Sequence, residues 1–190
     1  MRVIAGTARG RTLRAPKGMA VRPTSDRVRE AMFSSLAPVI PEAQVLDLFA
    51  GTGALGIEAL SRGASHATFV ERDPVTADIL RTNLSATGLA DRATVVRSAA
   101  VVFAGRHHLA PFTLVLCDPP YDLPLGGLLD VLEALDAGGG LAAHATVVVE
   151  RDKRDPALDG ELELRGLLAI DRRRAYGDTV LLYLRRPGDA

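Results

Sequence analysis

The sequence of 190 residues contains one cysteine, Cys117, so neither an internal disulfide bond nor a zinc site built on cysteines can form. A single cysteine is typical of a protein in a reducing compartment, and we expect a cytoplasmic location. Long hydrophobic runs are also lacking: the longest, such as 113–117 and 146–149, have the length of strands, and none can cross a bilayer as a helix. No apolar run follows the first arginines, so we expect no secretory signal.

The sequence also has no net charge, but its charged residues are unevenly distributed along the chain. Residues 1–38 contain eight basic and two acidic residues, a net charge of +6, whereas residues 39–190 contain 15 basic and 21 acidic residues, a net charge of −6. A basic N-terminal segment on an acidic body indicates a separate contact surface for an anionic partner such as a nucleic acid. The pattern by itself leaves open that these arginines only solubilise an N-terminal arm.

The first 38 residues predict a hairpin followed by a helix. Residues 2–6 and 11–14 are short strand-like runs on either side of a glycine-containing turn. Thr24 or Ser25 is a suitable N-cap for the helix. An apolar stripe with helical spacing follows, made of Val28, Met32, Phe33 and Leu36.

From residue 44 onward, apolar strands alternate with helices. The expected strands are 45–49, 67–71, 93–97, 113–118 and 146–150, and the expected helices are 53–62, 75–87 and 125–135. Two further strands, 167–174 and 179–185, flank a turn at Gly177-Asp178 and form an antiparallel hairpin. The pattern predicts an α/β fold with a seven-stranded, mostly parallel sheet and helices on both faces.

A glycine-rich loop lies between the first predicted strand of this alternation and the helix after it. Gly51, Gly53 and Gly56 match G-x-G-x-x-G, a loop that binds adenine-containing cofactors through close backbone approach and helix amides. Glu71 follows Gly51 by 20 residues at the end of the next strand, where a carboxylate can accept hydrogen bonds from ribose hydroxyls. Both features also suit a nicotinamide dinucleotide, so they do not identify the cofactor.

Asp47 precedes the loop and favours a cationic ligand. A carboxylate four residues before Gly51 would repel a pyrophosphate but suits the methionine end of S-adenosylmethionine, unless it is a fully hydrogen-bonded core carboxylate. The segment Phe49-Ala50-Gly51-Thr52-Gly53 is similar to the first motif of class I methyltransferases. At the end of the third strand, Ala99 offers no polar side chain to an adenine, so backbone amides or Ser98 must supply that contact.

A second motif, Asp118-Pro119-Pro120-Tyr121, follows the fourth strand at the edge of the sheet where ligands bind. The two prolines fix the backbone, so that the Pro119 carbonyl and the Asp118 carboxylate can both accept hydrogen bonds from one –NH₂ group. Such bonds would free the lone pair of a conjugated amine for attack on an activated methyl group. Asp118 could also take the proton, and Tyr121 offers a face on which a flipped-out base can stack.

These motifs and the N-terminal segment together resemble the RsmD family of bacterial 16S rRNA guanine-N2 methyltransferases. The resemblance covers nearly the whole chain and is most specific in the N-terminal run. The segments that carry it are Arg2-Val3-Ile4-Ala5-Gly6, Arg9-Gly10-Arg11, Arg22-Pro23-Thr24-Ser25-Asp26-Arg27-Val28-Arg29-Glu30, residues 46–63 around the glycine loop, and Tyr176-Gly177-Asp178-Thr179. Ala99 departs from the commoner family pattern, which affects only the adenine contact.

The resemblance implies methylation of the exocyclic N2 amine of one guanine in 16S rRNA, within the small ribosomal subunit or a precursor particle. It implies an RNA-binding extension at 1–38, a methyltransferase domain at 39–190, S-adenosylmethionine as cofactor and no metal. A small globular domain without an evident coiled-coil pattern is also expected to be a monomer. The catalytic residues are then Asp118, Pro119 and Tyr121. The residues expected to bind the cofactor are Asp47, Phe49, Gly51, Gly53, Glu71, Arg72, Ser98, Ala99 and Asp118. Those expected to bind RNA are Arg2, Arg9, Arg11, Arg14, Arg22 and Arg27.

Three other functions remain compatible with parts of the sequence. An enzyme of the same fold could methylate adenine N6, cytosine N4 or a glutamine amide, since these sites also place an acid or amide before Pro-Pro-aromatic. A nicotinamide-dependent dehydrogenase could use the same glycine loop, although no His or Lys lies near the expected cleft. A non-catalytic ribosome-assembly factor would not need Asp47, Glu71 and Asp118 together.

Overall fold

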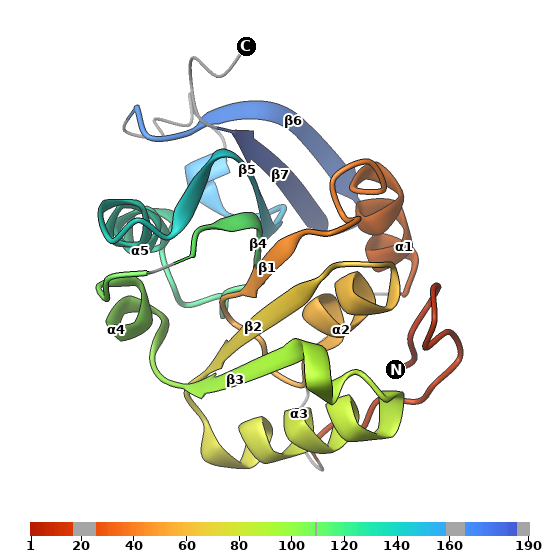
Figure 1. Cartoon of the computed structure of the whole chain (residues 1–190). Coiled ribbons are helices and arrows are strands. Elements are labelled where there is room, and N and C mark those ends of the chain that lie inside the picture. The colour runs from red at the N-terminus through yellow and green to blue at the C-terminus, as the bar shows by residue number, and fades with distance from the viewer. Residues whose placement is uncertain (17–25, 109, 159–165, 186–190) are drawn as a thin grey trace.

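The computed structural model describes residues 1–16, 26–108, 110–158 and 166–185. A seven-stranded sheet with the order β3-β2-β1-β4-β5-β7-β6 forms its centre (Figure 1). The strands are β1 (Gln44–Asp47), β2 (His66–Glu71), β3 (Ala93–Arg97), β4 (Phe112–Cys117), β5 (Leu141–Asp152), β6 (Ala169–Tyr176) and β7 (Thr179–Arg185). Strands β1 to β5 pair in parallel, and β7 pairs antiparallel with both β5 and β6. The predicted mixed sheet with a C-terminal hairpin is therefore confirmed.

Helices cover both faces of this sheet. They are α1 (Asp26–Ser35), α2 (Ala54–Ser61), α3 (Pro74–Thr87), α4 (Ala100–Ala104) and α5 (Leu125–Ala137). The helix α3 begins where Asp73 accepts a hydrogen bond from the Thr76 amide at 2.8 Å, and it ends at Gly88, whose φ is 73°. The helix α4 was not predicted because a five-residue apolar run has no helical periodicity that distinguishes it from a strand.

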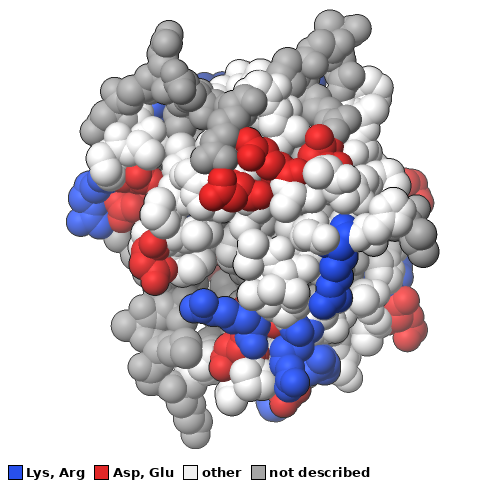
Figure 2. Space-filling model, turned by 90° about the vertical axis from the view of Figure 1, so that its left-hand side faces the viewer, with Lys and Arg blue, Asp and Glu red and all other residues white. Residues whose placement is uncertain are grey.

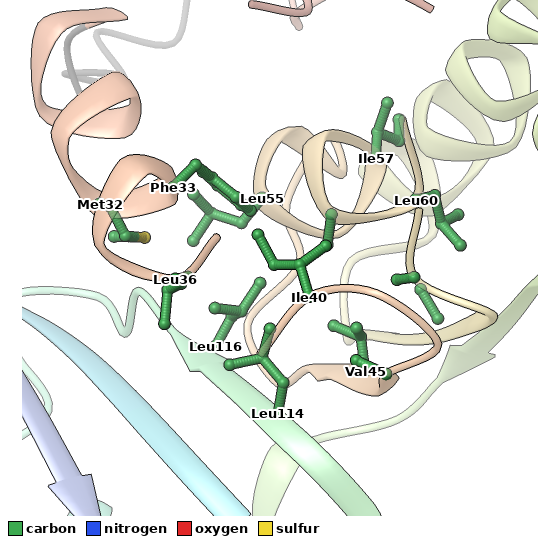
Figure 3. Packing of buried hydrophobic residues seen from close by; sticks show 14 of the residues in the cluster. Met32, Phe33, Leu36, Ile40, Val45, Leu55, Ile57, Leu60, Leu114 and Leu116 are labelled. Atoms are coloured by element: carbon green, nitrogen blue, oxygen red, sulfur yellow. The ribbon is translucent and has the colours of Figure 1, made fainter. Parts of the chain in front are cut away.

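Two hydrophobic clusters lie on opposite faces of the sheet. Side chains from α1, α2 and α3 pack with Val45, Leu114 and Leu116 in one cluster. Side chains from α4 and α5 pack with Leu46 and Val115 in the other. Neighbouring residues of a strand thus enter opposite clusters, as the two-residue period of a strand requires. Figure 3 shows Met32 and Phe33 of α1, and Leu36 just after it, packed over the strands beside Leu55 of α2.

The N-terminal segment pairs with itself but does not form the two predicted strands. Its ends are joined by one bridge, between Arg2 and Thr12, and the amides of Ile4 and Ala5 donate instead to the buried Glu58 carboxylate of α2, at 2.7 and 3.0 Å. Backbone hydrogen bonds across the segment are therefore limited to a short stretch, from the amides of Val3, Gly10 and Leu13 to the carbonyls of Arg11, Val3 and Met1. The predicted caps Thr24 and Ser25 lie outside the described residues.

The strand β5 is longer than predicted. It begins at Leu141 rather than at residue 146, because Leu141 pairs with Phe112 on β4 before a shift in register. The intervening residues Ala142, Ala143 and His144 give no strand-like apolar alternation, so the sequence pattern could not reveal them. Among the described residues, no helix is long and apolar enough to span a membrane.

Candidate cofactor and acceptor site

A cavity of about 600 Å³ opens at the carboxyl ends of the parallel strands. The adjacent strands β1, β2, β3 and β4 all end at this edge, on the left-hand side of Figure 1, and their following loops line the cavity. Figure 2 views the molecule from that side and shows acidic side chains gathered in the upper centre and most basic ones in the lower centre, where a few acidic side chains lie beside them. Eight predicted site residues line the cavity together: Asp47, Phe49, Gly51, Glu71, Arg72, Ser98, Ala99 and Asp118.

The other three residues predicted for this site lie just outside the lining. Gly53 precedes α2 with a φ of 86°, and a Cβ there would lie 2.2 Å from the Leu80 side chain, so this glycine shapes the loop. Pro119 is buried, and Tyr121 is 65% exposed. Pro120, between them, lines the cavity instead.

Asp47 is a buried carboxylate with one oxygen left without a hydrogen bond. Its Oδ2 accepts the Gly56 amide at 2.9 Å, while its Oδ1 has no hydrogen-bond partner in the described part of the chain. Burial raises the pKa of Asp47 to about 7, and the negative charges of Asp118 and Glu71 add to this, against the opposing Gly56 bond. Asp47 is therefore not a fully satisfied core carboxylate, and a cationic group in the cavity would stabilise its charged form.

Glu71 holds the glycine loop against the end of β2. Its Oε2 accepts the Gly51 amide at 2.9 Å, and its Oε1 accepts the Asp73 amide at 2.7 Å. Each carboxylate oxygen has a second lone pair, so both can still accept hydrogen bonds from a ligand hydroxyl. The sequence indicated the ligand contact of Glu71 but not this support of the loop.

Asp118 follows Cys117 at the end of β4 and faces the same cavity as Asp47. The Cys117 thiol is buried, and its pKa is raised by burial and by the charges of Asp47 and Asp118, so it stays protonated. The arrangement combines carboxylates from β1, β2 and β4 around one cavity. Such a site suits a ligand with positive charge and hydroxyl donors, and it lies beside acceptors for an amine.

Two buried polar residues at the site were missed by the sequence interpretation. Arg29 is fully buried and lines the cavity, although its Nη2 donates to the Arg2 carbonyl and to Asp26, both at 2.7 Å. Asn83 of α3 is also fully buried and donates to the Thr52 carbonyl at 2.9 Å. The available signal was the same for both: a polar residue inside the apolar stripe of a helix.

Those arginines predicted to bind RNA that the structure describes do not line the cavity. Arg22 lies outside the described residues. The other five are all exposed: Arg2, Arg9, Arg11, Arg14 and Arg27.

The chain is similar to a protein family and to individual proteins named as methyltransferases. The family model described as Conserved hypothetical protein 95 matches residues 1–185. The chain is 45% identical over 152 residues to "Ribosomal RNA small subunit methyltransferase D" of Escherichia coli (strain K12), which covers 80% of this chain and 75% of that protein. It is 37% identical over 193 residues to YlbH of Bacillus subtilis (strain 168), covering 98% of this chain and 100% of the relative. The solved structure of yhhF from Escherichia coli matches with a TM-score of 0.85 and 39% identity, over 98% of this chain and 97% of that one.

Proposed function

The chain belongs to the Conserved hypothetical protein 95 family, as its resemblance to RsmD predicted, and on that premise we propose that it methylates the N2 amine of a guanine in 16S rRNA. The fold is that of a class I methyltransferase, and the cofactor is S-adenosylmethionine. The observation that carries the proposal is that Asp118, at the start of the amine-binding motif, lines the same cavity as the glycine loop. A methyl donor and an acceptor amine would therefore meet within one site.

The residues on the cofactor side fit S-adenosylmethionine, which supplies an activated methyl group on a sulfonium. The unsatisfied Asp47 Oδ1 accepts from the ammonium of its methionine end, and Gly51 permits close approach of the backbone. Glu71 accepts from the ribose hydroxyls, with Arg72 beside it. Phe49, Ser98 and Ala99 line the remaining wall, where backbone amides and the Ser98 hydroxyl contact the adenine.

On the acceptor side, Asp118 and the Pro119 carbonyl bind the guanine N2 amine. Two acceptors hold the two N–H groups and turn the nitrogen lone pair toward the methyl group. The Asp118 carboxylate can also take the proton released by methyl transfer. The exposed ring of Tyr121 provides a surface on which the flipped base stacks, worth roughly 1–3 kcal/mol.

The N-terminal extension, residues 1–38, supplies the RNA contact. Exposed arginines there bind phosphates and position the enzyme, whereas the flipped base and the surrounding RNA shape specify the site. We place the substrate in the small ribosomal subunit or a precursor particle, and therefore in the cytoplasm. We expect the active unit to be a monomer, because this small domain has no evident coiled-coil pattern.

The experiment is methyl transfer by the purified protein to small subunits, naked 16S rRNA and DNA, followed by identification of the modified nucleoside. We expect N2-methylguanine in rRNA, and loss of activity in Asp118→Ala. Product on adenine N6, cytosine N4 or a glutamine amide would instead identify another amine acceptor. Absence of any product in the presence of cofactor and small subunits would favour a non-catalytic assembly factor.

A further inference from the structure

Arg29 is a fully buried arginine to which the roles proposed above assign nothing. It lies on α1, on the side that packs against the rest of the protein, one turn before Phe33. Only its Nη2 is engaged, by the Arg2 carbonyl and by Asp26. Its Nε and Nη1 are buried without a hydrogen-bond partner among the described residues. Buried donors of a cation are seldom left unsatisfied, because the desolvation is not recovered.

The Arg29 side chain belongs to the wall of the candidate cofactor cavity. Arg29 lines the cavity together with Asp47 and Leu55. Phe33, one turn after Arg29, packs beside Leu55 at the start of α2 (Figure 3). The start of α2 follows the glycine loop directly, so α1 brings Arg29 to the loop side of the cavity rather than to the outer surface.

Asp47 supplies the complementary half of a binding site on the same cavity. Its Oδ1 is a buried acceptor without a partner, whereas Nε and Nη1 of Arg29 are buried donors without one. A zwitterionic amino acid presents one ammonium and one carboxylate on the same carbon. Its ammonium satisfies an acceptor and its carboxylate satisfies donors, so this ligand chemistry would satisfy both sets at once.

We propose that Arg29 binds the α-carboxylate of the methionine end of S-adenosylmethionine, opposite Asp47, which binds the α-ammonium. The inference rests on the proposed function only in taking S-adenosylmethionine as the cofactor. It makes Arg29 a cofactor-binding residue of the N-terminal segment rather than an RNA-binding one. Loading of the cofactor therefore depends on a residue from the segment whose exposed arginines contact RNA.

The test compares two ligands that differ by one carboxylate: S-adenosylhomocysteine and its decarboxylated analogue, S-adenosyl-3-thiopropylamine. Their dissociation constants are measured by calorimetry with the full-length protein. We expect the natural protein to prefer S-adenosylhomocysteine by about 10- to 100-fold, since a hydrogen-bonded charge pair contributes that much. Arg29→Met should abolish this preference by weakening the binding of S-adenosylhomocysteine alone.

The preference within one variant is insensitive to a general loss of folded protein, because both ligands bind the same molecules. Arg29→Lys, which keeps the charge but not the guanidinium, provides a second variant and should show a reduced preference. Arg27→Met is the matched control, since Arg27 is exposed on the same helix, and it should retain the full preference. Asp47→Asn should weaken both ligands and keep the carboxylate preference.

A preference retained in Arg29→Met would overturn the proposal, as would equal binding of the two ligands by the natural protein. Loss of RNA binding by Arg29→Met with an intact carboxylate preference would assign Arg29 to RNA and also overturn it. Failure of the substrate assignment gives a different result. In that case the carboxylate preference behaves as described, but no N2-methylguanine is formed.

Discussion

The buried amide of Asn83 holds the backbone of Arg14 by two hydrogen bonds. The Arg14 amide donates to Asn83 Oδ1 at 2.8 Å, and Asn83 Nδ2 donates to the Arg14 carbonyl at 3.1 Å. The same Nδ2 donates to the Thr52 carbonyl in the glycine loop at 2.9 Å. One side chain of α3 therefore joins the basic N-terminal segment to the glycine loop.

Replacing Asn83 should loosen both attachments. In Asn83→Leu the Arg14 amide and two carbonyls lose their partners, and we expect the free energy of unfolding to fall by roughly 3 kcal/mol. Urea denaturation measures this change, and calorimetry with S-adenosylhomocysteine should show weaker binding. Ser85→Ala, at an exposed position of the same helix, is the control and should change neither. Stability and affinity equal to those of the natural protein would contradict the joining role of Asn83.

Substitutions at two glycines test how the N-terminal segment packs against α2. Gly6 and Gly10 have φ values of 82° and 81°, so an alanine is strained by roughly 1–2 kcal/mol at either position. A Cβ at Gly6 would lie 1.8 Å from the Ser61 carbonyl oxygen, whereas a Cβ at Gly10 meets nothing within 4 Å. We expect Gly6→Ala to displace the segment and weaken RNA binding, and Gly10→Ala to show only the smaller loss of stability. Hydrogen exchange of residues 1–14 would reveal the difference, and equal exchange in the two variants would refute it.

The raised pKa of Asp47 predicts how cofactor binding depends on pH. The free site holds its proton up to about pH 7, and the bound ammonium favours the charged carboxylate, so binding releases a proton below that pH. Affinity for S-adenosylhomocysteine should rise by up to about tenfold per pH unit toward pH 7 and then level off. Calorimetry in buffers of different ionisation enthalpy measures the released proton. Asp47→Asn should bind weakly with little change between pH 5.5 and 7, and a slope that persists in this variant would exclude Asp47 as its cause.

The same titration has the opposite sign for the stability of the ligand-free protein. The folded state holds the Asp47 proton more tightly than the unfolded state, so this residue makes stability fall as pH rises from about 4 to about 7. Above pH 7 its contribution is constant. Asp47→Asn should therefore gain stability relative to the natural protein as pH rises through this window. Urea denaturation without ligand at pH 5 and pH 8 checks this, and a difference in stability independent of pH would contradict it.

Charge reversal at the exposed arginines should separate RNA binding from cofactor binding. We expect Arg9→Glu, Arg11→Glu or Arg14→Glu to weaken binding to small-subunit rRNA and to lower the slope of log affinity against log salt by about 1 for each lost phosphate contact. Affinity for S-adenosylhomocysteine should remain that of the natural protein. Filter binding at several salt concentrations measures the first effect. Unchanged RNA affinity in all three variants would contradict the proposal that the N-terminal extension binds RNA.

Most of the fold could be predicted because its signals are local. Strand β3 was predicted with its observed bounds, and α3 differed by one residue, since periodicity, caps and glycines lie within one element. The failures had distant causes. The pairing of Leu141 with Phe112 extends β5, and the Glu58 carboxylate binds the amides of Ile4 and Ala5 where a hairpin strand was predicted. Neither partner is evident from the residues next to it in the chain.

The candidate site, like the fold, was predicted only in part from the sequence. By itself, the sequence determined the chemical groups of the site: the glycine loop, the carboxylates of Asp47 and Glu71, and the motif that begins at Asp118. Each lies within a few residues of the end of a predicted strand. Only the tertiary structure decided that Arg29 faces that cavity and that Asn83 joins the N-terminal segment to the glycine loop. The physical reason is burial. In the sequence, a polar residue on an apolar helix stripe carries no sign of its partner, whereas in the folded protein each buried donor and acceptor has to be satisfied by a group that packing places beside it.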